Sequence, residues 1–523
     1  MKKKSLAIIG AGSSGLITLK TALDSLSNWE IQCFERSSNV RGCWGNPYKG
    51  FISTSTKFTT QFNCHIKYDA TVSEDSSQYH EFFKDGEYGD YLEDFAKTYH
   101  LHKLVQLNTE VSKIRRTDGK WTLEFSDAAK QAQIFTHIIV CTGLTESPKE
   151  VHSTIPTLYN LREISSLRKK TVVVMGGGES AADTANRLAR SELKNTVYLS
   201  LKRGIRVSPR YHPIRGVPSD FLRTRLMLSI RAGLRNKIGQ KFVESRIRYR
   251  RLFERVFPHG GKRSTKATKD YEEVRRYWDM LLTQSAKDQL FNMFHNKSDG
   301  FLDAVSEGRI KIIGPPTDGT LTSFKKFQQD SEIVFTPDIL IPKLGFQSRL
   351  STFFEPSIHV SDFYMGCIHK EYENVFLVGF ARPVIGNIPT IAEQQANYII
   401  KLLKGSLHRQ PDIISKYKSE RERLAKQFPM LNLKTLYPVE MFPYCDALAK
   451  EMGVYPSLKK VGSLYCWLKI ILSPASTMHY LDENHDSRSV SKLPIHSPVL
   501  INLLLILVKL LDRSWFSTSK EQL

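Results

Sequence analysis

Two glycine-rich stretches of the sequence have residue types and spacing that suit a turn around a nucleotide phosphate. The first follows an apolar run, opens a helical pattern and consists of Gly10, Ala11, Gly12, Ser13, Ser14 and Gly15. In such a turn the first glycine permits a tight bend, the second lets a pyrophosphate approach, and the third lets the helix pack on the strand. The amino terminus of the helix would supply amide donors to the phosphates.

An acidic residue lies where a unit of this kind contacts the ribose. Glu35, followed by Arg36, ends the next predicted strand, at roughly the 20-residue distance expected for the ribose contact. Its carboxylate would accept hydrogen bonds from the hydroxyls of an adenosine ribose, as in FAD or NAD. The alternative is a glycine turn without a ligand.

The second stretch repeats the strand, turn and helix, but its next strand ends differently. Its candidate nucleotide contacts are Gly176, Gly178, Ser180, Ala181, Ala182 and Asp183, with the alanine at 181 in the third glycine position. Where the first unit has Glu35, this unit has Lys202 and Arg203, and a cationic pair suits a ribose 2′-phosphate. The sequence therefore predicts NADP at the second turn. A solvated strand end is the alternative for the two cations.

Two dinucleotide sites in one chain predict electron transfer between a nicotinamide and a flavin. The seven cysteines include no Cys-x-x-Cys pair, so a dithiol relay is not expected, and their odd number favours a reducing compartment. Oxygen is then the obvious electron acceptor, with a diffusible quinone as the alternative. The 15 histidines show no metal-ligand spacing, so no metal site is expected.

The elements that must position these turns are those of an α/β protein. The apolar content of 41% is that of a globular chain. Strands are predicted at 4–9, 29–36, 137–143, 171–175, 196–204, 308–313, 336–346 and 374–380, and a helix at 389–405. The predicted fold has two Rossmann-like dinucleotide-binding domains, with the NADP domain inserted into the FAD domain, and a helical C-terminal tail. The expected ranges are 1–150 and 321–445 for the FAD domain, 165–320 for the NADP domain with a basic helical insert near 210–300, and 446–523 for the tail.

Further motifs follow one another along nearly the whole chain. They are "FERSSNVRGCW" at 34–44, "GDYLEDFAKTYHL" at 89–101, "GGGESAAD" at 176–183, "FLDAVSEGRI" at 301–310 and "EQQA" at 393–396. No single motif is decisive, but the ordered set resembles that of the flavin-containing monooxygenases, the animal-type class B flavoprotein monooxygenases.

The resemblance implies an enzyme in which NADPH reduces FAD and oxygen then forms a flavin C4a-hydroperoxide. This species oxygenates a soft nitrogen or sulfur centre of a small molecule. By position, the resemblance places FAD against the first turn, Glu35, Cys43 and Trp44, and places Gln394 near the flavin. It places NADP against the second turn, Lys202 and Arg203. Because the cofactor carries the difficult chemistry, no acid–base triad is expected.

The segment that faces the flavin in this family departs here from the family pattern. The family has Thr-Asn-Ser-Ser-Lys, and this chain has the residues Ser53, Thr54, Ser55, Thr56 and Lys57. Thr54 thus stands in place of the asparagine as the candidate catalytic residue, and it lacks the paired donor and acceptor of an amide. Its neighbours Ser53 and Ser55 are expected to contact the cofactor. A polar loop is the alternative.

Two other family patterns are incomplete. Phe-x-Gly-x-x-x-His-x-x-x-Phe is missing before the second unit, and Ala-Thr-Gly-Tyr is reduced to Gly345 and an aromatic residue. Two further functions therefore stay open. One is an uncoupled NADPH oxidase that releases hydrogen peroxide, and the other is a non-catalytic, membrane-associated nucleotide-binding protein.

The formal charge of +22 indicates an acidic partner, and much of it lies in one segment. Residues 221–266 hold 14 lysines and arginines against two acids. A helical face is predicted from Val243, Ile247, Phe253, Val256 and Phe257, flanked by Arg246, Arg248, Arg250 and Arg251. A basic amphipathic helix is typical of a membrane surface. A nucleic-acid partner is not expected, because no nucleic-acid fold motif accompanies the charge; a solvated insertion is the alternative.

The C-terminal segment has an apolar run of 13 residues at 499–511 that includes Asn502 and Lys509. A spanning helix needs roughly 20 residues, so this tail is expected to lie in or on a bilayer. Arg513 and Trp515 suit the membrane interface. The resemblance implies the cytosolic face of the endoplasmic reticulum membrane. A helix that contacts a second copy in a homo-oligomer is the alternative.

Overall fold

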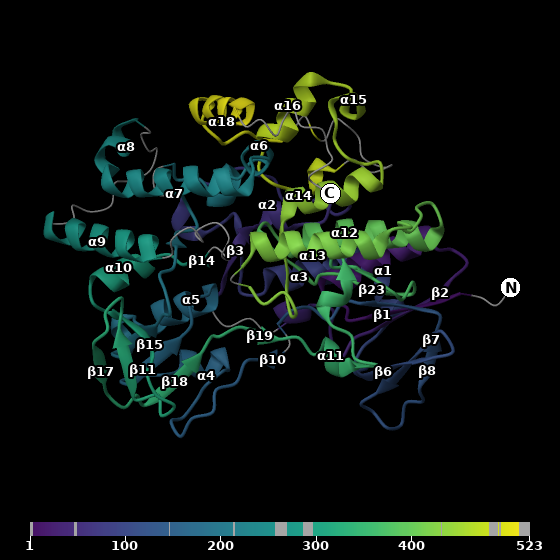
Figure 1. The fold of residues 1–523 in the computed structure, drawn as a ribbon, viewed down its shortest axis with the longest axis horizontal. Helices are drawn as coiled ribbons and strands as arrows, with labels where there is room; N and C mark the ends of the chain where they lie inside the picture. Colours follow the sequence, from purple (N-terminus) through teal and green to yellow (C-terminus); the bar gives the residue numbers. More distant parts are fainter. Residues whose placement is uncertain are drawn as a thin grey trace.

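The structure is a computed structural model that describes residues 4–45, 50–145, 147–212, 215–256, 269–285, 296–429, 431–480, 490 and 493–511. Two mixed sheets, each with a parallel core, lie side by side, and helices from the middle and the end of the chain cover one end of both (Figure 1). The α/β fold with two Rossmann-like units and a helical C-terminal part is therefore confirmed.

The first sheet has seven strands in the order β21-β22-β23-β9-β1-β2-β5. Their bounds are β1 Ser5–Ile9, β2 Glu30–Phe34, β5 Val105–Gln106, β9 His137–Val140, β21 Phe363–Tyr364, β22 Ile368–His369 and β23 Val375–Leu377. The central strand β1 lies parallel between β2 and β9. Leu6 to Ile9 are buried because the sheet is covered by helices such as α1 (Ser13–Ser25) and also by the strands β7 (Lys120–Phe125) and β8 (Gln133–Phe135), which explains the unbroken apolar run of this strand.

Two helices from opposite ends of the first domain pack together on this sheet. They are α1 Ser13–Ser25 and α12 Ile388–Lys404. The side chain of Asn387 accepts the N–H of Thr390 at 2.9 Å and so begins α12, and Gly405 ends it with a φ of 82°. The helix predicted from Pro389 and Gly405 is confirmed.

The second sheet has six strands in the order β17-β16-β15-β12-β11-β18. Their bounds are β11 Thr171–Met175, β12 Thr196–Ser200, β15 Ile310–Pro316, β16 Ser323–Lys326, β17 Glu332–Val334 and β18 Ile339–Pro342. The helix α5 Glu179–Leu188 follows β11. The sheet continues to Pro342, past the expected domain boundary at 320, because β16 and β17 form an antiparallel extension before the chain returns to β18.

Shorter strands connect and border these two sheets. The pair that matters for the site is β3 Ile52–Thr56 with β4 Phe82–Lys84. The remaining strands are β6 Val111–Thr117, β7 Lys120–Phe125, β8 Gln133–Phe135, β10 Ser147–Pro148, β13 Val207–Ser208, β14 Asn296–Lys297, β19 Phe346–Gln347, β20 Phe354–Glu355, β24 Ala381–Ile385 and β25 Tyr437–Glu440. The shorter and outer helices are α2 Lys57–Thr60, α3 Glu87–Thr98, α4 Leu161–Ser165, α6 Arg225–Leu228, α10 Phe301–Ser306, α11 Leu350–Phe353 and α13 Ile413–Gln427.

The basic insert folds into α7 Ala232–Arg248, α8 Arg250–Val256 and α9 Lys269–Ser285. The single basic face predicted across this segment is interrupted, because the helix breaks at Tyr249. Arg246 does not join an outer basic surface: burial, together with the charge of Arg206, lowers its pKa to about 9. Ile247 is buried as predicted. Phe257 and the side chains of Arg251 and Val256 lie outside the described residues.

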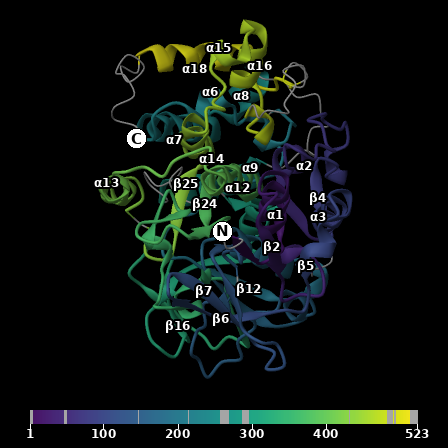
Figure 2. The same cartoon turned by 90° about the vertical axis from the view of Figure 1, so that its right-hand side faces the viewer.

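The last part of the chain forms α14 Met441–Glu451, α15 Leu458–Val461, α16 Leu464–Leu472 and α18 Val499–Leu511. The apolar run at 499–511 is thus a helix, as predicted. Figures 1 and 2 both place α15, α16 and α18 at the same end of the molecule. Among the described helices, none has the length and apolar content needed to cross a membrane. Arg513 and Trp515 lie outside the described residues.

Candidate active site

The first glycine turn leaves no space for larger residues at its two ends. Gly10 has a φ of 96°, and a Cβ there would lie 2.8 Å from the carbonyl oxygen of Cys141. A Cβ on Gly15 would lie 1.8 Å from the carbonyl oxygen of Gly10. These contacts hold the start of α1 tightly against the end of β1. The backbone amides of the turn are thereby fixed in the arrangement that binds a pyrophosphate.

Glu35 binds the turn from the neighbouring strand. Its carboxylate is buried and accepts the N–H of Ala11 at 2.7 Å and the N–H of Ser37 at 2.9 Å. Glu35 thus positions the turn, and each of its oxygens retains a lone pair for a ribose hydroxyl. The adjacent Arg36 is exposed.

The short helical turn η1 Gly42–Trp44 brings Cys43 and Trp44 to the first glycine turn. A Cβ on Gly12 would lie 3.3 Å from the Cα of Gly42, so the two backbones are in close contact. Trp44 packs edge-on against Tyr88, with ring centroids 5.1 Å apart. The loop predicted to border the cofactor therefore does lie beside the turn.

The two serines of the first turn differ in their surroundings. Ser14 is buried, and a Cβ on Gly379 would lie 2.2 Å from its Oγ, so this side chain is part of the packing between α1 and the end of β23. Ser13 is half-buried at the first position of α1. Ser13 is therefore the better placed of the two to meet a ligand.

The second glycine turn has the same construction at the end of β11. Gly176 has a φ of 128°, and a Cβ there would lie 2.4 Å from the carbonyl oxygen of Lys343. A Cβ on Gly178 would meet no described atom within 4 Å, so the backbone is open to an approaching ligand. Ala181 and Ala182 are buried in the core beneath the turn, whereas Ser180 is exposed in the first turn of α5.

Two cations stand just beyond the end of β12. Lys202 is exposed and Arg203 is half-buried. Within the described part of the chain, neither side chain has a hydrogen bond or an ion pair, in contrast to Asp183, which pairs with Arg187 at 3.5 Å. Two uncompensated cations at the carboxyl edge of the sheet suit a phosphate ligand.

The strand β3, which carries Thr54, contacts the second domain through Arg210 and Lys297. Ser53 is buried: its Oγ donates to the carbonyl of Ser55 at 2.7 Å and accepts the N–H of Phe83 at 3.0 Å. Ser53 therefore shapes the strand and has little capacity left for a ligand. The hydroxyls of Thr54 and Ser55 form no hydrogen bond with other described residues. These two side chains are the free polar groups of the strand.

A buried ion pair that the sequence did not reveal supports this strand. The Nζ of Lys297 donates to the carbonyl of Thr54 at 2.5 Å and lies 2.6 Å from the Oδ1 of Asp220. Both side chains are more than nine-tenths buried. Burial alone would raise the pKa of Asp220, but the charges of Lys297 and Arg223 outweigh it and hold the pKa below its usual value. Burial lowers the pKa of Lys297, and Asp220 opposes that shift.

Two further contacts join β3 to the second domain. Arg210 donates to the carbonyls of Ser53 at 2.8 Å and Ile52 at 2.6 Å. The backbone N–H of Lys297 donates to Glu179, which begins α5 beside the second glycine turn, at 3.3 Å. Burial raises the pKa of Glu179 to about 6, against the opposing charge of Lys297. Lys297 therefore contacts both β3 and the helix of the second turn.

Several buried polar atoms around these turns have no partner among the described residues. They are the Oε1 of Gln394, the Oγ1 of Thr390 and the Oδ1 of Asn296. The first two lie in the first half of α12, and the amide of Asn296 donates to the carbonyl of Gly177 in the second turn. Buried polar atoms are normally hydrogen-bonded, so these atoms fit sites that a bound cofactor completes. Gln394 was predicted; Thr390 and Asn296 were not.

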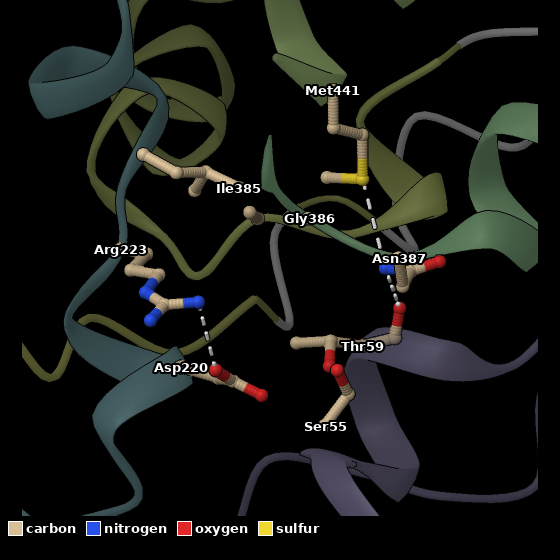
Figure 3. A pocket seen from close by; sticks show the side chains of 9 residues that line it. Ser55, Thr59, Asp220, Arg223, Ile385, Gly386, Asn387 and Met441 are labelled. Carbon is tan, nitrogen blue, oxygen red and sulfur yellow. Dashed lines mark hydrogen bonds and ion pairs between the residues drawn. The ribbon is translucent and has the colours of Figure 1, made fainter. Parts of the chain in front are cut away.

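A small pocket opens beside β3. Its lining residues are Ser55, Thr59, Asp220, Arg223, Ile385, Gly386, Asn387, Met441 and Ala475. Figure 3 shows Arg223 and Asp220 on one side of this pocket and Thr59 and Asn387 on the other. The amide of Asn387 donates to the carbonyl of Thr59 at 2.6 Å, which joins the start of α12 to α2. The pocket thus lies where β3 and α12, the two elements expected to border the flavin, meet.

Comparison with known proteins identifies the family. The family described as flavin-binding monooxygenase-like matches residues 3–269, which is half of the chain. The chain is 24% identical over 495 residues to flavin-containing monooxygenase 5 of Rattus norvegicus, covering 88% of this chain and 84% of the relative. It is 23% identical over 491 residues to a 4-hydroxybenzoate brominase (decarboxylating) of Pseudoalteromonas luteoviolacea (strain 2ta16), covering 87% and 85%.

The solved structures show the same fold. An oxidised steroid monooxygenase bound to NADP aligns with a TM-score of 0.57 at 15% identity, covering 86% of this chain and 97% of its own. This likeness shows that the fold is that of known monooxygenase structures. The chain belongs to the flavin-binding monooxygenase-like family and is a flavin-dependent oxidoreductase with FAD and NADPH as its cofactors.

Proposed function

We propose that this enzyme uses NADPH and O2 to oxygenate a soft nitrogen or sulfur nucleophile of a small molecule. For a thioether the balanced reaction is R–S–R′ + O2 + NADPH + H⁺ → R–S(=O)–R′ + H2O + NADP⁺. Sulfur and the nicotinamide each lose two electrons, and O2 gains four. The observation that carries this proposal is the contact of Lys297 with both Thr54 and Glu179, which joins β3, beside the pocket, to the helix that follows the second glycine turn.

The chain itself would bind, orient and shield the cofactors. The amides of the first turn and the carboxylate of Glu35 would hold FAD, and the second turn with Lys202 and Arg203 would hold NADPH. FAD supplies the redox chemistry and the reaction with O2 when it is bound. The buried pair of Lys297 and Asp220 would fix the carbonyl side of β3 and leave the hydroxyl of Thr54 to face the reaction.

A soft nucleophile suits the pocket because its reacting atom needs no deprotonation. A thioether or a tertiary amine already carries a free lone pair. The one carboxylate that lines the pocket, Asp220, is paired with Lys297 at 2.6 Å and with Arg223 at 3.4 Å, and its pKa is held below the usual value. Asp220 is therefore a poor proton acceptor, which argues against substrates that need a general base.

A second function, NADPH oxidase activity that releases hydrogen peroxide, is favoured by one observation. The hydroxyl of Thr54 is a single small donor with no partner among the described residues, in a strand whose neighbours are already engaged. A threonine hydroxyl has one O–H to donate, whereas an asparagine amide has two N–H donors beside its carbonyl acceptor. If the site held activated oxygen only weakly, the electrons from NADPH would be released as hydrogen peroxide instead of being used to oxygenate a substrate.

One experiment separates these two functions. The holoenzyme is reduced with NADPH without oxygen, and O2 is then admitted with methyl p-tolyl sulfide present. Loss of flavin absorbance on NADPH addition followed by sulfoxide in step with NADPH consumption supports oxygenation. Peroxide equal to the NADPH consumed, without sulfoxide, supports the oxidase and overturns oxygenation. Failure of the purified protein to bind FAD would overturn both.

Removal of the two free cations is expected to change coenzyme preference. In the variant with Lys202→Gln and Arg203→Gln, the KM for NADPH should rise roughly 10- to 100-fold, because charge-assisted hydrogen bonds to the 2′-phosphate are lost. The KM for NADH, which lacks this phosphate, should change little. Steady-state kinetics with both coenzymes measure the effect. The control is Lys170→Gln, which removes a charge at the opposite edge of the same sheet. If the ratio of the KM values for NADPH and NADH were unchanged in the double variant, the assignment of NADP to these cations would be contradicted.

We also propose that the end of the molecule formed by α15, α16 and α18 contacts a lipid surface. The apolar side chains of α18 at positions 499, 500, 503, 504, 507, 510 and 511 are 47–74% exposed. Leu464, Tyr465 and Leu468 of α16 are also exposed, and Lys459 and Lys460 flank them. Soluble proteins seldom expose so much contiguous apolar surface, and neighbouring lysines attract anionic lipids. The endoplasmic reticulum stays a prediction of the family resemblance, and a contact in a homo-oligomer stays the alternative for this helix.

Charged residues on α18 are expected to weaken vesicle binding. Leu503→Glu with Leu507→Glu should reduce cosedimentation with phosphatidylcholine–phosphatidylserine vesicles roughly 10- to 100-fold, because each buried leucine contributes about 1.5–3 kcal/mol. The control is Val334→Glu, an equally exposed apolar position on β17, away from α18 (Figure 1). Unchanged sedimentation, or a change of oligomeric state without vesicles, would contradict the lipid proposal.

A further inference from the structure

A carboxylate stands at the point where the second glycine turn would bind the diphosphate of NADP(H). Glu179 is the first residue of α5 and follows Gly178, whose backbone is open to a ligand. The backbone N–H groups of Glu179 and Ser180 donate to no other atom of the described chain, so they are available to an anion. A glutamate carboxylate lies no more than about 6 Å from its own backbone nitrogen. An anion on these amides would therefore be close to a like charge.

The carboxylate of Glu179 is weakly compensated in the structure. The residue is half-buried. Its one hydrogen bond with a described residue comes from the backbone N–H of Lys297, at the long distance of 3.3 Å. It forms no ion pair with any lysine or arginine in the described part of the chain. A partly buried carboxylate with so few partners is close to the condition in which the neutral form is preferred.

The nearest cations are held by other groups. The ammonium of Lys297 lies 2.6 Å from Asp220, and the guanidinium of Arg210 lies 2.7 Å from Asp299. Both cations also donate to backbone carbonyls of β3. Lys297 and Arg210 thus act on Glu179 only from a distance, and their short contacts lie elsewhere.

The other charged groups around the start of α5 add little. Arg382 of β24 and Glu179 attract each other, whereas Asp183, one helical turn further along α5, repels the carboxylate. The elements packed against α5 are α4, α10, β11, β12 and β14. In α4 Glu163 is exposed, and in α10 Asp303 pairs with an arginine of α9 at 2.7 Å. The strands β11 and β12 contain no carboxylate and no cation.

These surroundings set the protonation of Glu179 in the free enzyme. Burial is the largest influence and raises its pKa from 4.5 to about 6. The charges of Lys297 and Arg210 lower the pKa, and the charge of Asp183 raises it. At neutral pH the carboxylate is therefore ionised without coenzyme, but a modest further influence suffices to protonate it.

We propose that binding of NADP(H) at the second glycine turn is coupled to protonation of Glu179. The diphosphate brings negative charge to the amides of α5, and a like charge beside a carboxylate favours its neutral form. In the free enzyme the ionised carboxylate occupies the anion-binding end of the helix. In the complex the coenzyme supplies that charge, and Glu179 takes up a proton from solvent. This inference rests on the assignment of NADP to the second turn and is independent of the oxygenation step.

The coupling predicts that affinity for the coenzyme falls as the pH rises. Below about pH 6 Glu179 is already protonated in the free enzyme, so the coenzyme meets no opposing charge. Above that pH, binding must take a proton from an ever more dilute supply, and the Kd rises until the pH exceeds the higher pKa of the complex. If the coenzyme raises the pKa by about one unit, the Kd rises roughly 10-fold over this range.

Calorimetry of NADP⁺ binding to the oxidised, FAD-loaded enzyme tests the coupling without turnover. Titrations at pH 7 in Pipes and in imidazole, two buffers with different ionisation enthalpies, give the number of protons taken up. The 2′-phosphate of NADP⁺ itself titrates at about pH 6, so the decisive quantity is the difference between the wild type and Glu179→Gln. The glutamine keeps an acceptor for the N–H of Lys297.

The wild type should take up about 0.4 of a proton more per NADP⁺ than Glu179→Gln at pH 7, for a pKa shift of about one unit. Glu179→Gln should bind NADP⁺ roughly 10-fold more tightly than the wild type at pH 8 and with nearly the same Kd at pH 5.5. Glu179→Asp, which returns the carboxylate, should restore the proton uptake and the dependence on pH.

The control for total charge is Glu192→Gln. Glu192 is an exposed acid of the short helical turn η4 Ser191–Leu193 in the same domain, so this variant should behave as the wild type does. FAD absorbance per protein should be the same in all variants, because Glu179 has only one long hydrogen bond to lose among the described residues.

Each contrary outcome overturns a distinct claim. Equal proton uptake by the wild type and Glu179→Gln would overturn the coupling. Weaker NADP⁺ binding by Glu179→Gln at every pH would show that the carboxylate is a ligand of the coenzyme, which also overturns it. No NADP⁺ binding by the wild type would overturn the assignment of the second turn together with this inference. Oxygenation is decided separately, by the formation of sulfoxide.

Discussion

Gly15→Ala is expected to yield protein that contains no FAD and is largely insoluble. The added Cβ would lie 1.8 Å from the carbonyl oxygen and 2.8 Å from the carbonyl carbon of Gly10, and neither backbone atom can move without displacing β1. Because β1 is the central strand of the first sheet, the strain spreads to β2 and β9. A clash of this kind costs more than about 3 kcal/mol, a large part of the stability of a domain. Soluble yield and FAD absorbance per protein measure the effect.

A second glycine gives the matched control. Gly233 in α7 has no described atom within 4 Å of the position its Cβ would take, so Gly233→Ala should fold normally and keep its FAD. If Gly15→Ala bound FAD as well as this control, the tight contact between β1 and α1 would be refuted.

Lys297→Met is expected to lower the free energy of unfolding by about 3–5 kcal/mol, as measured when one partner of a buried ion pair is removed. Asp220 would lose its contact at 2.6 Å and keep Arg223, at 3.4 Å, and the N–H of Thr56, at 3.1 Å. The carbonyl of Thr54 would also lose its donor. Urea unfolding followed by flavin fluorescence and circular dichroism gives the change.

Two comparisons test the cause of this loss. Lys113→Met removes a lysine that contacts Glu355 at 2.5 Å on the surface, and it should cost less than about 1 kcal/mol. Adding Asp220→Asn to Lys297→Met should recover part of the stability, because it removes a buried carboxylate that would keep only a long contact with one cation, Arg223. Equal losses from Lys297→Met and Lys113→Met would show that burial of the pair is unimportant.

The glycine turns could be predicted from the sequence because their chemistry is local. Gly10 and Gly15 are five residues apart and follow a strand, and the structure gives Gly10 a positive φ and Gly15 no space for a side chain. The acid at Glu35 and the cations at Lys202 and Arg203 lie at the ends of strands. Strand ends can be predicted from the pattern of apolar residues and from the turn residues that follow it. The elements that carry the cofactor turns were therefore predictable in kind and order.

The buried pair of Asp220 and Lys297 could not be predicted, because 77 residues separate its members and a basic insert lies between them. In the sequence, Asp220 and Lys297 both have the pattern of ordinary polar residues beside a turn. Only the packing of β3 against the second domain removes both from water. The break at Tyr249 and the burial of Arg246 have the same origin, since helical periodicity does not report which neighbours a long insert will meet.

The order of strands in the two sheets has a consequence for how the chain acquires its structure during synthesis. The second sheet is built from one continuous stretch, β11 to β18, whereas the first is incomplete until β23 joins β9 after that whole stretch has been made. Domains fold as units when their segments are available, and distant pairings form late. The second domain can therefore fold on the ribosome while the edge of β9 stays uncovered. This exposed edge makes the unfinished first domain the part of the nascent chain most dependent on chaperones.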